Sequence, residues 1–575
     1  MGVQDHQFVV EPKALVVPEE DIASTSAVVL PEVPERMLHR VFQHMSESER
    51  DFALQQRLVP VTWLPHFTLY ADAAPTGMRD PEFPHAHIVA RIDPRRFQEG
   101  VRTYLRKELA EAAAFSLRRK APVFSAHQRI ERHQARVAVA GLLGFLALCL
   151  VLPFQILYAG ASLALTSVFL AMVWLRLLAI TEALPRRRYE PERDDAKLPV
   201  YSVLVPVFRE ISVLPQLLGA LRCLNYPAHK LDIKLILEET DTVMQRAVAR
   251  LALPPSIEVL VVPAGKPQTK PRALNYALHF ARGSLLTIYD AEDIPDPMQL
   301  RLAARAFASD AQDLGCLQAE LAFYNPNENW LTRQFTVEYA SLFTLLLPAL
   351  AKYDLPLPLG GTSNHFRTDV LRAAGGWDPY NVTEDADLGF RLARLGYRTG
   401  VLPSVTHEEA NTEISNWLQQ RARWMKGFLQ TWLVHMRHPV ALLHDIGWPG
   451  FMVLQTTVLG IVLSALIQPL FFITNVVRLQ ADLSAGARAS AAVVVINSLV
   501  IGFMLLGCII SLVSGAIGLR RKGLPMWPGT LLTMPLYWLL GSIASWMALW
   551  QFITRPFHWN KTRHGLSRFV RDPRP

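Results

Sequence analysis

Apolar residues along this chain gather in long uncharged runs, separated by stretches in which apolar and polar positions alternate. The first run, residues 137–175, is too long for one membrane helix, because about 20 residues rising 1.5 Å each span the hydrocarbon core. Pro153, Ala159 and Gly160 offer a turn near its middle. The pattern therefore predicts a transmembrane hairpin within residues 136–183, with spans near 137–157 and 161–182.

Further uncharged runs follow at residues 447–477, 489–519 and 524–554. The first two predict full spans near residues 448–472 and 492–517. The last is flanked on both sides by Lys and Arg, so the positive-inside bias places both flanks in the cytoplasm. Since two crossings need about 40 residues, we expect residues 526–553 to form a re-entrant or interfacial pair of short helices, broken near Pro535 and Gly541. The C-terminal membrane region thus covers residues 446–554, and a cytoplasmic tail covers 555–575.

The stretches between these runs predict folded domains outside the membrane. Residues 195–445 alternate short apolar runs with amphipathic stretches, a pattern typical of an α/β domain. Residues 36–130 predict a small cytoplasmic α+β domain, preceded by a flexible tail of residues 1–35. Two interpretations of the small domain stay open: a regulatory or docking module, or a stabilising appendage. The strands of the large domain are expected at 200–208, 233–239, 257–262 and 284–289.

The formal net charge of +8 raises the question of nucleic-acid binding. The Lys and Arg clusters flank the apolar runs, however, which is typical of anchoring at the cytoplasmic membrane face. No nucleic-acid-reading motif accompanies them, so we expect no nucleic-acid partner. The 4 cysteines show no paired spacing, and neither a zinc site nor a disulfide framework is predicted. The N-terminus has no secretory signal pattern, so residues 1–130 are expected to stay in the cytoplasm.

Acidic residues cluster at the expected ends of the strands in the α/β domain. In open sheets of this kind, ligands bind where the carboxyl ends of the strands meet loops and helix N-termini. Carboxylates crowded at a strand end repel one another and pack poorly, so they are seldom structural. They therefore predict a ligand site at Asp290, Glu292 and Asp293. Glu238 and Glu239 follow an earlier strand, where a ligand site and a solvated acidic loop are equally open interpretations, and Glu210 follows the first strand.

Other motifs lie further along the chain. Lys270 and Pro271 begin a helix that contains Asn275, and the lysine and the free backbone donors of a helix start suit an anion. Glycines at positions 360 and 361 allow a ligand to approach the backbone closely. Downstream come the triplet Thr383, Glu384, Asp385 and, on an amphipathic helix, the set Gln420, Arg423, Trp424.

In this order, the motifs resemble those of family-2 membrane glycosyltransferases of the cellulose, curdlan and hyaluronan synthase type, over roughly residues 195–570. The resemblance implies a GT-A-type nucleotide-sugar domain inserted in an α-helical transmembrane domain. It also implies an inverting, processive enzyme that polymerises a β-linked exopolysaccharide, with UDP-glucose as the expected donor, and moves it across the bacterial inner membrane. The implied partners are the UDP-sugar, the growing polysaccharide, the lipid bilayer and periplasmic or outer-membrane export proteins.

The same resemblance implies roles for individual residues. An inverting transfer needs a carboxylate that takes the proton of the acceptor hydroxyl, and the match of Thr383, Glu384 and Asp385 assigns this base to Asp385, although Asp387 competes on sequence alone. The chain departs from the family's usual Asp-Asp at positions 238 and 239. Residues implied in nucleotide-sugar binding are Glu210, Glu238, Glu239, Lys270, Asn275, Asp290, Gln420, Arg423, Trp424, Lys561 and Thr562.

A divalent cation is also implied, because a departing diphosphate needs its charge neutralised. Mg²⁺ and Mn²⁺ take oxygen ligands, normally one or two carboxylates together with the phosphates. The family commonly has Asp-x-Asp at this place. Here Asp290 is one ligand, and either Glu292 or Asp293 is the other.

The C-terminal segment 557–565 resembles the family's gating loop, with His564 in place of a lysine. Rival hypotheses are a non-processive enzyme that adds one sugar to a lipid-linked acceptor, and a non-catalytic membrane scaffold with a vestigial domain. The Gln420–Trp424 motif argues against the first, and the intact acids Asp290 and Asp385 argue against the second.

Overall fold

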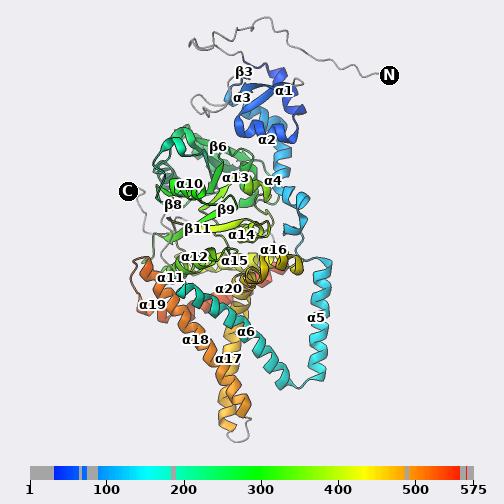
Figure 1. Ribbon diagram of the computed structural model, residues 1–575, viewed down its shortest axis with the longest axis vertical. Coiled ribbons are helices and arrows are strands. Elements are labelled where there is room, and N and C mark those ends of the chain that lie inside the picture. The colour runs from blue at the N-terminus through cyan, green and yellow to red at the C-terminus, as the bar shows by residue number, and fades with distance from the viewer. Residues whose placement is uncertain are drawn as a thin grey trace, which may run out of the picture.

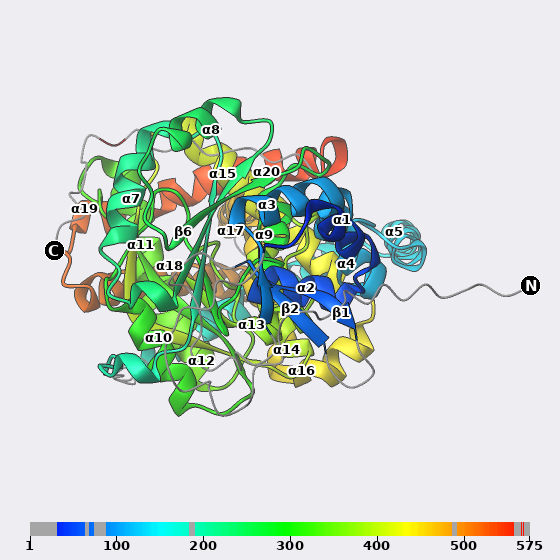
Figure 2. The same ribbon diagram turned by 90° about the horizontal axis from the view of Figure 1, so that it is seen from above.

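The computed structural model describes residues 32–63, 68–73, 88–182, 190–485, 491–556, 565 and 567. Along its longest axis a small N-terminal unit lies next to an α/β domain, and long helices extend from the opposite end of that domain (Figure 1). Viewed from above, the N-terminal unit covers one side of the α/β domain (Figure 2). This architecture confirms the expected fold class of an α/β domain joined to a helical region and a small α+β unit.

The N-terminal unit packs helices on a sheet of strand order β1-β2-β3, in which β1 and β2 are antiparallel and β2 and β3 parallel. The first helical stretch divides because Ser46 and Glu49 form a capping box that starts a new helix. Phe42 and Phe97 are buried in its core. Its elements are α1 (Glu35–His44), α2 (Glu47–Gln56), β1 (Leu58–Trp63), β2 (Thr68–Asp72), β3 (Ile88–Arg91), α3 (Pro94–Gly100), η3 (Val101–Leu105) and α4 (Arg106–Lys120).

The α/β domain is built on a mixed sheet of strand order β6-β5-β4-β7-β10-β9-β11-β8. Strands β4 to β7 are parallel and buried, which explains their Val, Ile and Leu content. Strand β10 runs antiparallel between β7 and β9, and β11 runs parallel to β9. The strands are β4 (Tyr201–Val207), β5 (Leu231–Glu238), β6 (Ile257–Val262), β7 (Leu285–Ile288), β8 (Ile294–Pro295), β9 (Leu314–Phe323), β10 (Asn364–Arg367) and β11 (Arg398–Glu408).

Helices cover both faces of this sheet and form a layer between it and the long helices (Figure 1). Helix α11 (Trp330–Ser341), η8 (Leu342–Leu346) and α12 (Leu347–Lys352) form one continuous apolar stretch that was not predicted from the sequence. Its most apolar window is 67% buried, so it belongs to the interior of this layer. The other helices are α7 (Leu214–Arg222), α8 (Thr242–Ala249), α9 (Lys270–Leu278), α10 (Gln299–Ser309), α13 (Thr368–Ala373), α14 (Glu384–Arg394) and α15 (Ile414–His435).

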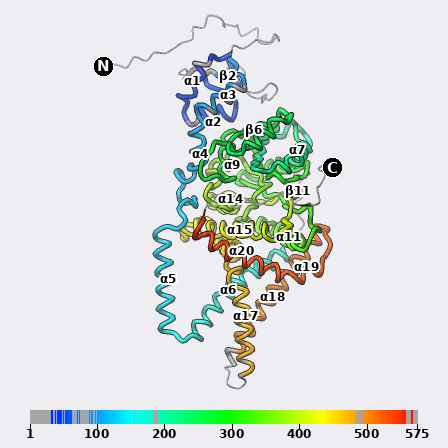
Figure 3. Tube along the Cα trace, turned by 180° about the vertical axis from the view of Figure 1, so that it is seen from behind, coloured from blue at the N-terminus to red at the C-terminus, as the bar shows by residue number. Residues whose placement is uncertain are grey.

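Among the described residues, 6 helical stretches are long and apolar enough to cross a membrane, including the buried one at α11. The hairpin near the N-terminus consists of α5 (Arg132–Val151) and α6 (Phe154–Thr181). Its turn lies at Leu152 and Pro153, so of the three residues expected to offer a turn Pro153 does so and Ala159 and Gly160 do not, and the second helix begins earlier than the expected residue 161. Proline forces the residue before it into an extended conformation, which ends α5, whereas Gly160 continues inside α6. Helix α5 stands apart from the other helices (Figure 3).

The next apolar run begins at a kink, where Gly447 interrupts α16 (Pro439–Leu454) with a φ of 64°. The helix continues through η9 (Gln455–Leu459) into α17 (Gly460–Ala485), and α18 (Ala491–Arg521) returns beside it. These helices cover the regions expected to span the membrane near 448–472 and 492–517.

The last apolar run differs from the expected pair of short helices. Helix α19 (Pro528–Leu532) is short, but α20 (Met534–Thr554) continues without a break through Gly541. Pro535 lies in the first turn of α20, where proline needs no hydrogen-bonded N–H. Helix α20 packs along α15 and crosses the direction of α17 (Figure 3).

Beyond α20 the chain returns to the α/β domain. The backbone N–H of Ser567 donates to a carboxylate oxygen of Glu409 at 2.7 Å, and its hydroxyl donates to Glu328 at 2.7 Å. Gly565 also donates its N–H to Glu409. Gly565 and Ser567 therefore lie on the same side of the molecule as the α/β domain.

This contact gives a prediction for topology. A fluorescent protein fused after Pro575 should fluoresce in a Gram-negative host, and alkaline phosphatase at the same position should be inactive, because both would lie in the cytoplasm. Fusions at residue 152, in the turn between α5 and α6, should give the opposite pattern and serve as the control. An active phosphatase at the C-terminus would mean that α20 crosses the bilayer.

Candidate active site

A cavity of about 1210 Å³ lies where the carboxyl ends of β4, β5, β7 and β11 face α11 and α15. It continues beyond this layer between α6, α17, α18 and α20. Strand ends, helix starts and the helical layer thus line one continuous space. Expected site residues that line it are Glu210, Glu238, Lys270, Asp290, Glu292, Thr383, Glu384, Asp385, Gln420, Arg423 and Trp424.

At the end of β5, Glu238 and Glu239 lie in different surroundings. Glu238 lines the cavity, and burial raises its pKa to about 7. One of its carboxylate oxygens has no hydrogen-bond partner in the described structure. Glu239 instead forms an ion pair with Arg106 of α4 and accepts the N–H of Ala264 at 2.9 Å. Glu238 is therefore the carboxylate that can meet a ligand.

Lys270 begins α9 and lies at the centre of the charged part of the cavity. Its ammonium group forms an ion pair with Asp290, at the end of β7, and donates to the carbonyl of Gly361 at 2.7 Å. Burial opposes the charge of Lys270, but Asp290 and Glu384 raise its pKa above the ordinary value. The lysine stays charged and can meet an anion.

The acids after β7 separate into a cavity residue and a structural one. Glu292 lines the cavity, and burial together with the charge of Asp290 raises its pKa to about 8. Asp293 is 1% exposed, and the same carboxylate oxygen accepts the N–H of Asp290 at 2.7 Å and the hydroxyl of Thr362. Asp293 holds the turn that presents Asp290, so Glu292 is the better candidate for the second metal ligand.

The triplet at residues 383–385 begins α14. Burial raises the pKa of Asp385, and burial together with the charge of Asp385 raises the pKa of Glu384 to about 8. A Cβ on Gly361 would lie 3.2 Å from Asp385 and 3.8 Å from the Lys270 ammonium. The glycine loop therefore passes directly beside the proposed base.

Asp387, the sequence competitor of Asp385, lies elsewhere. It is fully buried, accepts from Arg391 at 2.9 Å and faces His435 at 3.3 Å. Burial alone would raise the pKa of Asp387, but Arg391 and His435 hold that pKa below its ordinary value. Asp387 is part of a buried ion pair and has no access to the cavity.

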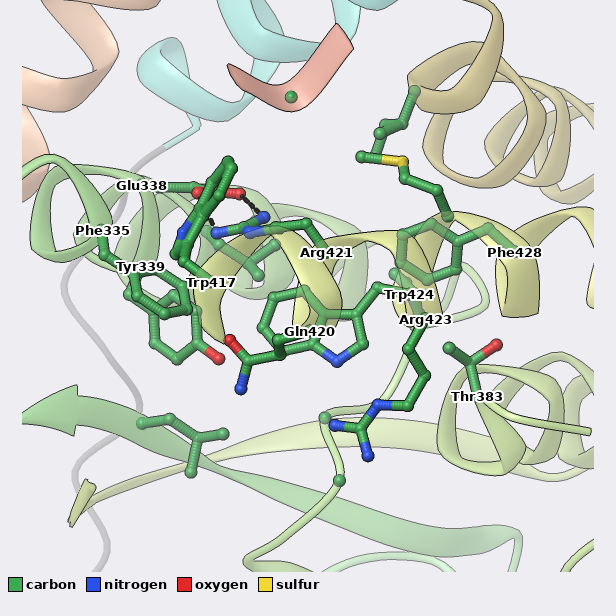
Figure 4. A pocket seen from close by; sticks show the side chains of 18 of the residues that line it. Phe335, Glu338, Tyr339, Thr383, Trp417, Gln420, Arg421, Arg423, Trp424 and Phe428 are labelled. Carbon is green, nitrogen blue, oxygen red and sulfur yellow. Dashed lines mark hydrogen bonds and ion pairs between the residues drawn. The ribbon is translucent and has the colours of Figure 1, made fainter. Parts of the chain in front are cut away.

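Helix α15 presents different residues to its two sides (Figure 4). Arg423 points toward the sheet, while Arg421 points toward α11. The guanidinium of Arg421 donates to Glu338 of α11 at 2.6 Å and to the hydroxyl of Tyr537 of α20 at 2.9 Å. It also lies 4.7 Å from the ring centre of Trp424. These contacts fix the position of α15 relative to α11, α20 and the cavity.

Some expected site residues are placed differently. The prediction that Asn275 binds the nucleotide sugar is corrected by the structure. The side-chain amide of Asn275 donates to the carbonyls of Ala113 and Trp377, and its oxygen accepts the N–H of Trp377. Asn275 therefore fixes the backbone and does not line the cavity. Lys561 and Thr562 lie outside the described residues.

Two further acids, Glu408 at the end of β11 and Glu409 directly after it, line the cavity and were not predicted from the sequence. Burial and the charges of Glu292 and Asp290 raise the pKa of Glu408 well above its ordinary value. The signal that could have located them is an acidic pair directly after a strand, the same signal used for Glu238 and Glu239. Within the described residues, no group of three or more His, Cys, Asp and Glu side chains is arranged to hold a metal by itself.

Comparison with known proteins identifies the domain. Residues 285–557 match the model of glycosyl transferase family group 2. The chain is 26% identical over 239 residues to the probable glycosyltransferase YdaM of Bacillus subtilis, covering 41% of this chain and 57% of that protein. It is 27% identical over 263 residues to the beta-monoglucosyldiacylglycerol synthase of Trichormus variabilis, covering 45% and 55%. Over 290 residues it is 26% identical to cellulose synthase 2 of Novacetimonas hansenii, covering 49% and 17%.

The chain carries a family-2 glycosyltransferase domain. This confirms the expected family, its GT-A-type fold and the enzyme class, so the scaffold hypothesis is not retained. The matched segments span little more than half of the first two relatives. The apolar helices and the similarity to membrane-associated enzymes indicate that the glycosyltransferase is a membrane protein.

The raised pKa values of Asp385 and Glu384 predict the pH dependence of the glycosyltransferase. A base works only when deprotonated, so the rate should fall as the pH drops through the raised pKa of the pair, at a higher pH than for an ordinary carboxylate. Glu384→Gln removes the neighbouring negative charge and should move this acidic limb to lower pH. Initial rates at saturating donor, from about pH 5 to 9, test this. If the acidic limb of the pH–rate profile lies at the same pH in Glu384→Gln as in the wild type, a group other than this pair controls the rate.

A second prediction separates the candidate metal ligands. Glu292→Gln should raise the Mg²⁺ or Mn²⁺ concentration needed for UDP binding by about tenfold, since a carboxylate ligand is lost. Asp293→Asn should bind UDP as the wild type does, because burial already favours the neutral acid and the amide oxygen can accept the same hydrogen bonds. Calorimetric titration of UDP at several metal concentrations distinguishes them. The reverse ranking would assign the ligand to Asp293.

Proposed function

We propose that the protein is an inverting, processive glycosyltransferase that builds a β-linked polysaccharide from a UDP-sugar, with UDP-glucose as the favoured donor. The observation that carries this proposal is the continuity of the cavity, which extends from Asp385 past Trp424 and on between α6, α17, α18 and α20. A product that grows at Asp385 has a path away from the base without leaving the protein. The names of relatives that act in β-glucoside and cellulose synthesis agree with β-linked sugars.

The chemical step is assigned to Asp385. It takes the proton of the acceptor hydroxyl as that oxygen attacks the anomeric carbon from the side opposite the leaving diphosphate. Burial, which raises its pKa, makes it a stronger base once deprotonated. The indole of Trp424 supplies an apolar face on which the terminal acceptor sugar can stack.

The donor is assigned to the sheet side of the cavity. Glu238 accepts a hydrogen bond from the nucleobase, and Lys270 and Arg423 lie where they can pair with the diphosphate. The guanidinium fork of Arg423 matches phosphate oxygens, while Lys270 adds a point charge. Before the donor enters, Lys270 is held by Asp290 and Gly361.

The residues present fit a divalent cation. Asp290 and Glu292 line the cavity side by side, and their mutual repulsion is one cause of the raised pKa of Glu292, which a bound cation relieves. One or two carboxylates completed by phosphates are the usual Mg²⁺ or Mn²⁺ site. When bound, the cation neutralises charge on the leaving diphosphate. Asp293 positions Asp290 for this purpose.

The proposed setting is the bacterial inner membrane, with the α/β domain in the cytoplasm and export proteins receiving the polymer on the far side.

Aromatic side chains follow the cavity below the base, and sugars stack on such rings. Among those that line it are Phe323, Phe335, Tyr339, Trp417, Tyr537 and Trp538.

A second candidate function is the transfer of one sugar to a lipid-linked acceptor. The observation that favours it is the apolar lining of the membrane-level part of the cavity, where Phe169, Met172, Met504 and Leu505 suit a lipid tail. The size of the product separates the two functions, because a lipid acceptor receives a single sugar whereas a processive enzyme extends one chain many times.

This leads to a prediction about product and base. Wild-type enzyme in lipid nanodiscs, given labelled UDP-glucose, should form polymer that a β-glucan hydrolase degrades. Asp385→Asn should lower turnover by about 100- to 10,000-fold while UDP binding stays near normal, since the base acts only in transfer. Asp387→Asn is the matched control and should instead lower thermal stability, because it breaks a buried ion pair.

Two results would contradict the proposal. Full turnover in Asp385→Asn would remove that residue from the mechanism. A product of one sugar on a lipid would select the second candidate function.

A further inference from the structure

A single arginine lies in the part of the cavity that the transfer reaction does not use. Arg176 belongs to α6, five residues before its end at Thr181, so it lies about 8 Å along the helix from the side of the α/β domain. Its side chain lines the cavity, and its guanidinium donates to the hydroxyl of Ser511 on α18. A charged group inside a membrane helix is costly, so its presence in a cavity indicates a binding role.

The charge of Arg176 has no close counter-charge in the described parts of the chain. No carboxylate there lies within ion-pair distance of its guanidinium, and its one hydrogen bond goes to a neutral hydroxyl. The carboxylate of Glu338 exerts a favourable field on it. That carboxylate is already bound by both nitrogens of the Arg421 fork. The remaining donors of Arg176 therefore suit an oxyanion supplied by a ligand.

The walls near Arg176 indicate what else the ligand carries. One turn or more further into the membrane, α6 contributes Phe169 and Met172, and α18 contributes Met504 and Leu505. These side chains cannot hydrogen-bond the hydroxyls of a sugar, but they accommodate an alkyl or prenyl chain. A cation at headgroup depth above an apolar wall has the chemistry of a site for a lipid phosphate.

We propose that Arg176, with Ser511, binds the phosphate of a lipid whose tail lies along the apolar wall of α6 and α18. The phosphate is that of a phospholipid headgroup or of a polyprenyl monophosphate, and both offer the oxyanion that the guanidinium fork matches. The site goes beyond the proposed function, because it holds whether this lipid starts a polymer, receives one sugar or only lines the path. No covalent step is involved.

Binding can be measured without turnover, so failure of this proposal and failure of the proposed function are distinguishable. The full chain in detergent would be titrated with a short-chain polyprenyl monophosphate, the matching prenyl alcohol, phosphatidylglycerol and phosphatidylcholine, and bound lipid counted by native mass spectrometry. The wild type should bind the prenyl phosphate about tenfold more tightly than the alcohol, as expected for a charge-assisted contact. Arg176→Gln should bind both equally, and Arg176→Lys should keep part of the preference.

Arg478→Gln provides the matched control. Arg478 also lies in a membrane helix, but it packs on the ring of Tyr158 at 4.1 Å and does not line the cavity, so its loss should leave the preference intact. A normal UDP affinity shows that each variant is folded. If the wild type binds the prenyl monophosphate more tightly than both phospholipids, the site belongs to a lipid carrier. If it binds phosphatidylglycerol as tightly as the prenyl monophosphate, the site belongs to a membrane lipid. Equal affinity of the wild type for phosphate and alcohol, or an unchanged preference in Arg176→Gln, would overturn the proposal.

Discussion

The ion pair between Arg421 and Glu338 fixes where α15 lies, and the active site depends on that position. Arg421 is held on one side by Glu338 of α11 and Tyr537 of α20. Trp424 packs on Arg421 and lines the cavity, and Arg423 of the same helix points toward the sheet and lines it too. A shift of α15 would therefore move Arg423, the proposed diphosphate partner, and Trp424, the proposed acceptor platform, together. Because α20 supplies one of the contacts, the packing of the membrane-side helices determines the geometry at the base.

The charges in the cavity explain its chemistry. Carboxylates that follow β7, end β11 and begin α14 line the cavity. Lys270 and Arg423 are cations that line the same space near them. This crowding, added to burial, raises the pKa values of Glu292 and Glu384. Such an excess of negative charge is stable when a ligand brings cations with it. The proposed metal–nucleotide complex would do so, and its phosphates would then pair with Lys270 and Arg423.

The sequence predicted most of the strand-end acids, because a carboxylate directly after a buried strand has few structural roles. It could not separate residues that share a motif but face different ways. Glu292 and Asp293 are neighbours, yet only Glu292 lines the cavity, since Asp293 is used by the turn. Asn275 was assigned to the ligand from its motif, but contacts distant in sequence, to Ala113 and Trp377, use its amide. Hydropathy located the apolar runs but could not choose Pro153 over Ala159 and Gly160 as the turn, because apolar residues continue on both sides of each.

The contacts of the N-terminal unit bear on the two interpretations left open for it. Arg106 of α4 binds Glu239, the residue next to Glu238, and the carbonyl of Ala113 accepts from Asn275 in α9. Helix α9 begins with Lys270, so α4 reaches both the nucleobase side and the phosphate side of the proposed donor region. The contact between Ala113 and Asn275 is buried, and a merely attached appendage has no need of a buried polar contact to α9. The unit is part of the frame that sets the position of α9, and any rearrangement of α4 must be transmitted to Lys270 and Glu238 through these contacts.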